Sequence, residues 1–378
     1  MTTGNAWCCG GADIAMPMHK MAGDSNNESL CLEAALERHR AFWLRTPVER
    51  PLLHVAPWQD WKPYAPYVLR DRSILPDGGD ITPGLLDPLA NLEPNRPRSV
   101  LDGDMIRAWG LYDLCWTEAM LGCRIVRKGP SVWAQARFTD WNEVESAVWV
   151  DSSPWLDELL AANRLLVALV KGGYPVAQPL MRGPLDMAAA ALPSEMLYTG
   201  FYERPEELRS LLNACADIFI AAVQQRLAQT PAFRGGYAAR QEWGLWAPGT
   251  TVQFQADASR NLSPALYREF MWEIDRRIAG SFEYSIIHTH SGSSHILPVL
   301  IEEPELKAIE VTLDPLPYGP EPLSLLPMLQ MVQQAGKSLY VSGPMKPHEL
   351  NVLLEHLAPQ GLAIGAGVSS TEQERGCR

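Results

Sequence analysis

The stretch Tyr284-Ser285-Ile286-Ile287-His288-Thr289-His290-Ser291-Gly292-Ser293-Ser294-His295 joins a short apolar run to three histidines. The run from Tyr284 to Ile287 is typical of a buried strand, and Gly292 marks its end. Side chains two residues apart in a strand point to the same face. His288 and His290 therefore leave the strand end side by side, which suits a metal ion or a proton-transfer site. A hydrogen-bonded pair of core histidines is the alternative interpretation.

From about residue 155 onward, segments with strand patterns alternate with segments of helical periodicity. Strands are predicted at 51–57, 175–181, 234–240, 251–257, 284–290, 306–313, 338–343 and 362–368. Helices are predicted at 30–43, 155–171, 205–228, 264–280, 293–303, 324–335 and 346–357. Strict alternation indicates parallel strands joined by crossover helices. A closed (β/α)8 TIM barrel of the α/β class is therefore predicted, with an N-terminal helical and irregular extension.

The domain organisation follows from the same patterns. Residues 1–27 have no clear periodicity and are predicted to form a flexible N-terminal arm. Residues 28–378 are predicted to form a single barrel domain, in which the proline-containing segment 58–150 is an irregular insertion over the active-site face. Residues 369–378 are too few to cover the last strand, so the N-terminal helix or the second subunit of a homodimer is expected to do so.

Composition and charge exclude several classes of protein. The 378 residues are 47% hydrophobic and 20% charged, which is typical of a globular chain with a large core. The net charge of -12 argues against nucleic acid and against an anionic membrane surface. Seven cysteines without a C-x-x-C pair favour a reduced, intracellular chain. Because neither a signal-peptide pattern nor a long apolar span is found, the cytoplasm is the expected compartment and a small molecule the expected partner.

Several motifs, in order along the chain, carry a resemblance to a known family. They are Arg182-Gly-Pro-Leu-Asp186, Tyr202-Glu-Arg-Pro-Glu-Glu-Leu208, Ala256-Asp257 with Leu262-Ser-Pro-Ala-Leu-Tyr-Arg-Glu-Phe270, and His288-Thr-His290-Ser-Gly292. The series, from about residue 30 to 370, resembles the uroporphyrinogen decarboxylase superfamily, and an uncharacterised branch of it. The resemblance implies a (β/α)8 barrel. It also implies one of two activities, cofactor-free decarboxylation or zinc-dependent methyl transfer between a corrinoid and a thiol.

The chain departs from both types of relative. The N-terminal segment with which the decarboxylases hold porphyrinogen carboxylates has no counterpart here, so porphyrinogen itself is not the expected substrate. The resemblance places His290 where the methyltransferases carry their first cysteine ligand, and the last strand ends in Gly367-Val-Ser-Ser370 without the second. A metal in this chain, zinc or another divalent ion, is therefore expected to have imidazole and oxygen ligands.

Three side chains are predicted to hold the metal, and three to carry the chemistry. His288 and His290 are the expected nitrogen ligands, and Glu310 in the following strand is the expected third ligand, with Asp257 as another carboxylate candidate. Asp257, His288 and Glu310 are the expected catalytic residues, although Asp257 is also typical of a structural carboxylate. His295 is expected to be a helix-cap or surface residue, with metal ligation as the alternative.

Four further residues are predicted to contact the substrate. Arg182 is suited to a carboxylate or phosphate, and a salt bridge with Asp186 is the alternative. Trp243 and Trp246 are candidates for stacking on a substrate ring, with core packing as the alternative. Asp314 ends a strand at the same face and is expected to reach the pocket.

Three functions are compatible with these residues. The first is metal-assisted transfer of a methyl or other small group to a thiol or corrinoid, with a corrinoid protein as a possible partner. The second is a cofactor-free decarboxylase of a small carboxylated substrate, in which Arg182 fixes the carboxylate and Asp257 or a histidine donates a proton. The third is a ligand-binding protein on a barrel that has lost catalysis.

Overall fold

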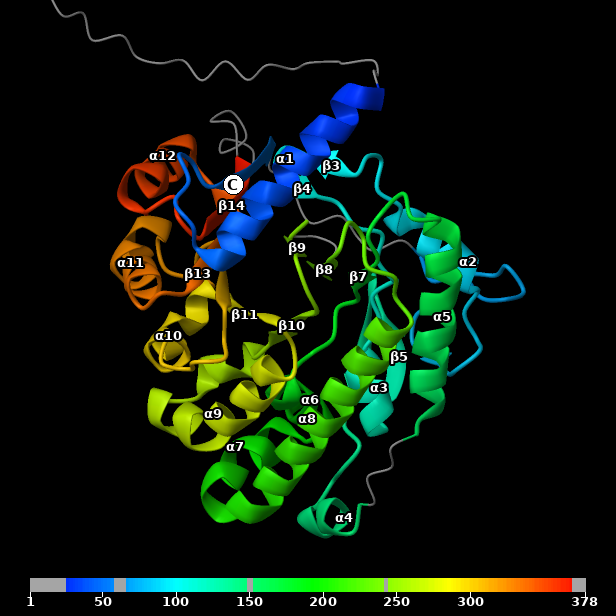
Figure 1. Ribbon diagram of the computed structural model, residues 1–378. Helices are drawn as coiled ribbons and strands as arrows, with labels where there is room; N and C mark the ends of the chain where they lie inside the picture. The colour runs from blue at the N-terminus through cyan, green and yellow to red at the C-terminus, as the bar shows by residue number, and fades with distance from the viewer. Residues whose placement is uncertain (1–24, 58–65, 148–151, 241–243, 369–378) are drawn as a thin grey trace, which may run out of the picture.

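The computed structural model describes residues 25–57, 66–147, 152–240 and 244–368, which surround a parallel β-sheet (Figure 1). Six strands pair in the order β1 (Leu52–Pro57), β14 (Leu362–Val368), β13 (Ser338–Met345), β12 (Ala308–Thr312), β11 (Tyr284–His290) and β10 (Thr251–Gln255). Every pairing between neighbours in this order is parallel. The predicted parallel sheet is therefore confirmed.

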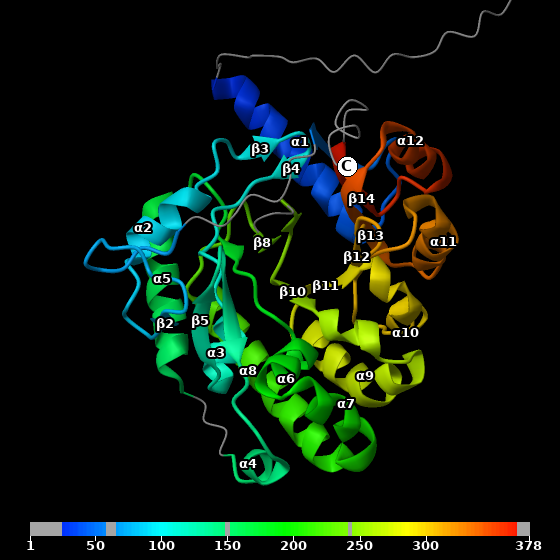
Figure 2. The ribbon, with the colours of Figure 1, turned by 180° about the vertical axis from the view of Figure 1, so that it is seen from behind.

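Helices follow the strands and cover the outer face of the sheet. Figures 1 and 2 show α9 (Pro264–Gly280), α10 (Leu297–Leu300), α11 (Leu326–Gln334) and α12 (Pro347–His356) along one rim of the molecule. Outward side chains such as Ile287, Val311 and Val341 are buried in the core on this side of the sheet. The predicted start of α9 is confirmed, since the Ser263 hydroxyl accepts the main-chain N–H of Leu266 and Pro264 opens the helix.

A second group of strands lies next to β10. β7 (Ala177–Gln178) is parallel to β8 (Tyr237–Arg240), which forms an antiparallel pair with β9 (Trp246–Ala247). Between β8 and β10 the described residues form no strand ladder. Instead the Gln178 amide donates to the carbonyl of Gln253 (2.6 Å) and accepts from its N–H (3.1 Å). This side chain joins β7 to β10, and the observed β7 is shorter than the strand predicted at 175–181.

The chain between β7 and β10 is mostly helical. Its helices are α6 (Pro184–Ala191), α7 (Ser194–Glu203) and α8 (Pro205–Ala228), and α5 (Pro154–Val170) precedes β7. The sequence patterns predicted α5 and α8 but not α6 and α7, which are short and separated by Pro193. The helix predicted at 293–303 is shorter than expected, because the turn η3 (Ser291–Ile296) takes its first residues.

The segment between β1 and α5 contains several short elements. Its helices are α2 (Pro88–Leu92), α3 (Trp116–Leu121) and α4 (Trp141–Glu145), with the 3-10 turn η1 (Glu93–Asn95). Its strands are β2 (Asp80–Ile81), β3 (Leu101–Asp102), β4 (Met105–Ile106), β5 (Arg124–Lys128) and β6 (Ser131–Gln135). α3 packs against α5 and α8, so part of this segment lies beside the helices. A cover over the active-site face stays a prediction.

The interior of the sheet is apolar at the end where the strands begin. Inward residues Ile286, Ala308, Tyr340 and Ala363 are buried there. They pack with Phe42 and Trp43 of α1 (Ser25–Leu44), which crosses in front of the strands in Figure 1. The N-terminal helix therefore forms a floor under the barrel, while β1, which follows it, pairs with β14 and covers the edge of the last strand.

Candidate metal centre

The two histidines of β11 meet above this apolar floor. His288 and His290 both face inward, as strand alternation predicts, and their ring centres are 4.8 Å apart. The two Nε2 atoms lie 3.3 Å apart. His288 is buried, whereas His290 keeps 35% of its side chain exposed. The pair thus extends from the buried interior of the barrel to its solvent-exposed mouth.

A carboxylate behind each ring determines which nitrogen faces the centre. The Nδ1 of His288 is hydrogen-bonded to Glu310 of β12, and the Nδ1 of His290 lies 2.7 Å from Asp314 Oδ1. An ionised carboxylate only accepts hydrogen bonds, so both Nδ1 atoms carry the proton. Both Nε2 atoms then direct lone pairs at one another in the neutral rings. Such an arrangement needs a cation between them, either a proton or a metal ion.

Asp257 completes the cluster from the neighbouring strand end. Its Oδ1 lies 3.8 Å from the Nε2 of His288 and 3.8 Å from that of His290. Its Oδ2 accepts a hydrogen bond from Gln255 (2.9 Å), whereas the buried Oδ1 has no hydrogen-bond partner among the described residues. A buried carboxylate oxygen in this state is costly unless a ligand satisfies it.

The three facing atoms fit a metal ion in size. Sides of 3.3, 3.8 and 3.8 Å define a triangle. Its centre lies about 2.1 Å from each corner, close to the ordinary zinc–imidazole bond of about 2.0–2.1 Å. Two imidazoles and one carboxylate are a donor set that zinc, iron, manganese and cobalt all accept.

The turn that carries Asp257 is held in place by α6. Asp186 accepts the main-chain N–H groups of Asp257 (3.0 Å) and Ala258 (2.8 Å), which open the 3-10 turn η2 (Asp257–Asn261). Burial and the charge of Asp257 raise the pKa of Asp186 to about 7. Asp186 therefore serves the main chain of η2 and makes no salt bridge with Arg182, which was its predicted alternative role.

Glu310 was predicted to be the third ligand, but it lies on the Nδ1 side of His288 and not on the Nε2 side, where the candidate ligand atoms meet. Its Oε2 contacts Nδ1, and its Oε1 accepts hydrogen bonds from Thr312 (2.6 Å) and Ser342. Burial alone would lower the pKa of His288, but the carboxylates of Glu310 and Asp257 together, with Glu310 as the stronger, hold that pKa above its ordinary value. The structure thus brings Asp257, rather than Glu310, to the open side of the histidine pair.

Asp314 likewise lies behind His290. Besides its contact with Nδ1, it accepts hydrogen bonds through Oδ2 from the Ser291 hydroxyl (3.2 Å) and the Gly292 N–H (3.3 Å). It also lines a cleft of about 180 Å³ together with Pro344, Met345 and Lys346. This position of Asp314 is consistent with its predicted place at the mouth of the barrel. Contact between Asp314 and the substrate stays a prediction.

Arg182 forms an ion pair with Glu118 of α3, a residue that the sequence did not point to. Glu118 is completely buried, whereas 34% of the Arg182 side chain is exposed. The two residues are 64 positions apart, so no local pattern announces the pair. Thr312 and Ser342, in contrast, occupy inward positions that strand alternation could have identified.

The remaining predicted residues lie elsewhere. Trp246 is fully buried against Leu36 and Phe233, and its Nε1 donates to the carbonyl of Phe233 (2.8 Å). This position agrees with the core-packing alternative for Trp246, while Trp243 lies outside the described residues. His295 lies within hydrogen-bonding distance of the Leu262 carbonyl (2.9 Å), which agrees with a role in joining two turns.

Comparison with known proteins identifies the fold. No protein-family model matches this sequence, and no curated protein matches it. A solved methyltransferase from Methanosarcina mazei matches 89% of this chain and 94% of its own, with a TM-score of 0.55 and 16% identity. A B12-independent methionine synthase from Shewanella sp. W3-18-1 matches 58% of this chain and 62% of its own, at a TM-score of 0.37 and 12% identity.

The first of these likenesses extends over nearly the whole of both chains, but its low identity limits it to the fold. The likeness and the parallel sheet confirm the predicted α/β fold class, although the strand pairings of the described residues do not close the ring. Within the described ranges, none of the helices has the length and apolar character that a bilayer crossing requires.

Proposed function

We propose that this chain is an enzyme that transfers a methyl or other small group with the help of a divalent metal ion. His288, His290 and Asp257 would hold the ion. The observation that carries the proposal is the convergence of two Nε2 lone pairs with an unpartnered, buried Asp257 oxygen. Two likenesses support methyl transfer as the reaction class: that of the motifs to zinc-dependent methyltransferases, and that of the fold to the Methanosarcina methyltransferase.

Each residue around the centre has a distinct role in this proposal. Glu310 and Asp314 orient the two rings and keep their Nε2 lone pairs directed inward. Gln255 binds Asp257 Oδ2 and leaves Oδ1 for the ion. A divalent ion at such a site lowers the pKa of a bound thiol or water, which provides a nucleophile at neutral pH. The methyl donor would be a small molecule or a corrinoid carried by a partner protein.

The absence of cysteine from this donor set distinguishes the chain from the thiolate-ligated zinc sites of the relatives it resembles. With two neutral imidazoles and one carboxylate, a divalent ion keeps one positive charge. That charge stabilises a bound anionic nucleophile more strongly than a site with two thiolates would. We therefore expect the acceptor to bind as its anion.

Elemental analysis of freshly purified protein tests the proposal. About one equivalent of zinc, iron, manganese or cobalt per chain is expected, together with its loss in His290→Ala. A metal-free protein that binds none of these ions when they are added would contradict the proposal. Activity that persists after chelation would instead favour the cofactor-free decarboxylase predicted as the alternative.

A further inference from the structure

The guanidinium of Arg182 is held by an ion pair through Nη1, while 34% of the side chain is exposed. Its Nη1 contacts Glu118 and lies 3.4 Å from the Cys115 sulfur, and these are its hydrogen bonds among the described residues. Nε and Nη2 form the opposite edge of the group, with two nearly parallel N–H bonds. This edge matches the two oxygens of a carboxylate.

Glu118 makes the open edge of Arg182 rigid. A fully buried carboxylate needs a charged partner, because an unpaired charge in the interior is strongly unfavourable. The neighbouring Thr117 hydroxyl lies 3.1 Å from the Arg182 carbonyl and 3.0 Å from Glu118 Oε2, which connects the main chain to the same place. Burial raises the pKa of the Cys115 thiol to about 12, so Cys115 stays neutral beside the pair.

The loop that carries Arg182 is packed on the strand end that carries the candidate metal centre. A β-carbon at Gly183 would collide with the carbonyl oxygen of Gln255, so the loop touches β10 there. Three residues later, Asp186 binds the main chain of Asp257 and Ala258. Arg182 therefore cannot move away from this end of the barrel without breaking both contacts.

We propose that Arg182 binds a carboxylate group of the substrate through Nε and Nη2, and that Glu118 is the residue that positions Arg182 for this task. The inference rests on the proposed function, because it places the substrate at the mouth beside His288, His290 and Asp257. The acceptor is then a small thiol that also carries a carboxylate. One end of such a molecule would approach the ion, and the other end would bind Arg182.

Two probe thiols of equal chain length test this inference. They are 3-mercaptopropionate, which carries the carboxylate, and 3-mercaptopropan-1-ol, which carries a neutral hydroxyl in its place. Calorimetric titration of cobalt-loaded and of metal-free protein gives the affinity for each. Since a charge-assisted hydrogen bond to Arg is stronger than a neutral one, the carboxylate is expected to bind about tenfold or more tightly.

The variants separate binding by Arg182 from positioning by Glu118. In Arg182→Gln the preference for the carboxylate should disappear while the metal content stays unchanged. Arg182→Lys keeps the charge without the paired N–H edge and should lose most of the preference. Glu118→Gln leaves Arg182 in place but loosens it, so an intermediate preference is expected. The double variant Arg182→Gln with Glu118→Gln leaves no buried charge and serves if Arg182→Gln does not fold.

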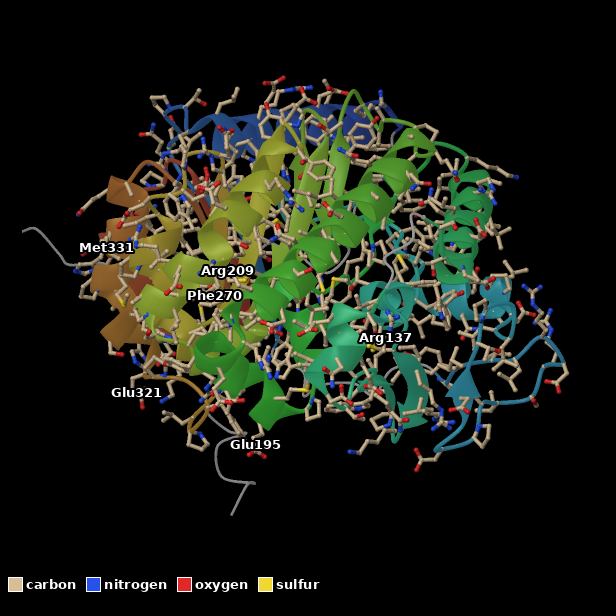
Figure 3. All side chains as sticks on the ribbon, turned by 90° about the horizontal axis from the view of Figure 1, so that it is seen from below. Arg137, Glu195, Arg209, Phe270, Glu321 and Met331 are labelled. Atoms are coloured by element: carbon tan, nitrogen blue, oxygen red, sulfur yellow. The ribbon has the colours of Figure 1, made fainter. Side chains whose placement is uncertain are left out.

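Arg209→Gln is the matched control. Arg209 lies on the outer face, as Figure 3 shows, stacked over Phe270 and paired with Glu269 (2.6 Å). Its loss should leave the probe preference unchanged. Equal affinities of the two probes for the wild-type protein, or an undiminished preference in both Arg182→Gln and the double variant, would overturn the inference. A protein that binds no metal but still prefers the carboxylate would overturn the proposed function and leave this inference standing.

Discussion

The two ends of the barrel both use buried histidine, but they use it in opposite ways. At the floor, His39 of α1 accepts the main-chain N–H of Trp246 at Nδ1 (3.2 Å), and its Nε2 lies 3.1 Å from the carbonyl of Asp104. At the mouth, His288 and His290 bind carboxylates through Nδ1 and direct Nε2 at each other. Both nitrogens of His39 therefore contact main-chain groups, whereas at the mouth the Nε2 atoms of two side chains face one another.

The surroundings push the pKa values of these rings in opposite directions. Burial lowers the pKa of His39 to about 4, and neither its main-chain hydrogen bonds nor the nearby Asp104 charge offsets this. Burial also disfavours charge on His288, but Glu310 and Asp257 together outweigh it and raise that pKa. A buried histidine is thus a structural residue when neutral groups satisfy it. It is a candidate for chemistry when an acid holds one nitrogen and the other nitrogen faces further metal-ligating side chains.

The comparison predicts that His290→Ala has the largest effect on metal binding. Loss of one of three protein ligands should weaken binding about a thousandfold, or roughly 4 kcal/mol. The measurement is competition for zinc against a chelator of known affinity. His295→Ala is the control, since His295 contacts the Leu262 carbonyl instead of the centre. Equal weakening in both variants would show that the centre lies elsewhere.

The parts of the fold that could be predicted from the sequence are those marked by a local repeat of apolar residues. Apolar runs bounded by turn residues located β10, β11, β12 and β14 to within two residues, because each strand buries its outward side chains against helices. The contact between β7 and β10 was not predictable in this way. It is made by the side chain of Gln178, which no strand pattern encodes.

In the candidate site, too, only part of the arrangement could be predicted from the sequence. The two-residue repeat of a β-strand predicted that His288 and His290 share one face, and the register of the parallel strands sets His288 beside Glu310. Which nitrogen of His288 meets Glu310 depends on the rotation of the ring, and sequence carries no signal for it. The pairing of Arg182 with Glu118 depends on how α3 packs, which is set by contacts distant in sequence.

At the floor, Trp43→Ala should destabilise the protein without changing the centre. Trp43 is buried, stacks edge-on with Phe42 (5.2 Å between ring centres) and donates its Nε1–H to the carbonyl of Trp246 (2.8 Å). Removing the ring should lower the free energy of unfolding by about 3–5 kcal/mol. Denaturant unfolding measures this loss. Zinc affinity of the folded variant should match the wild type, and a large drop would mean that the two ends are coupled.

His39 should make the floor sensitive to acid. Its folded-state pKa of about 4 lies below the ordinary 6.5, so the unfolded chain binds more protons between these pH values. The free energy of unfolding should therefore fall as the pH drops from about 6.5 to 4, by roughly 3 kcal/mol at most. Unfolding of wild type and His39→Gln across this range measures the contribution as a difference. Parallel pH profiles of the two proteins would contradict the prediction.

Glu310→Gln tests the mouth with the smallest chemical change. The variant keeps an oxygen that can accept the Nδ1 hydrogen of His288 but loses the negative charge. A second-sphere change of this kind typically weakens metal binding by about 10–100-fold. In the metal-free variant, burial is no longer outweighed, so the pKa of His288 should fall below its ordinary value. Chelator competition and NMR titration of the imidazole measure the two effects.

Ser342→Ala, which removes only one donor to Glu310, should change both metal affinity and the pKa of His288 far less, because the carboxylate charge stays in place. If Glu310→Gln leaves both quantities unchanged, the charge behind His288 does not distinguish the mouth from the floor. The facing Nε2 atoms would then have to be explained by geometry alone.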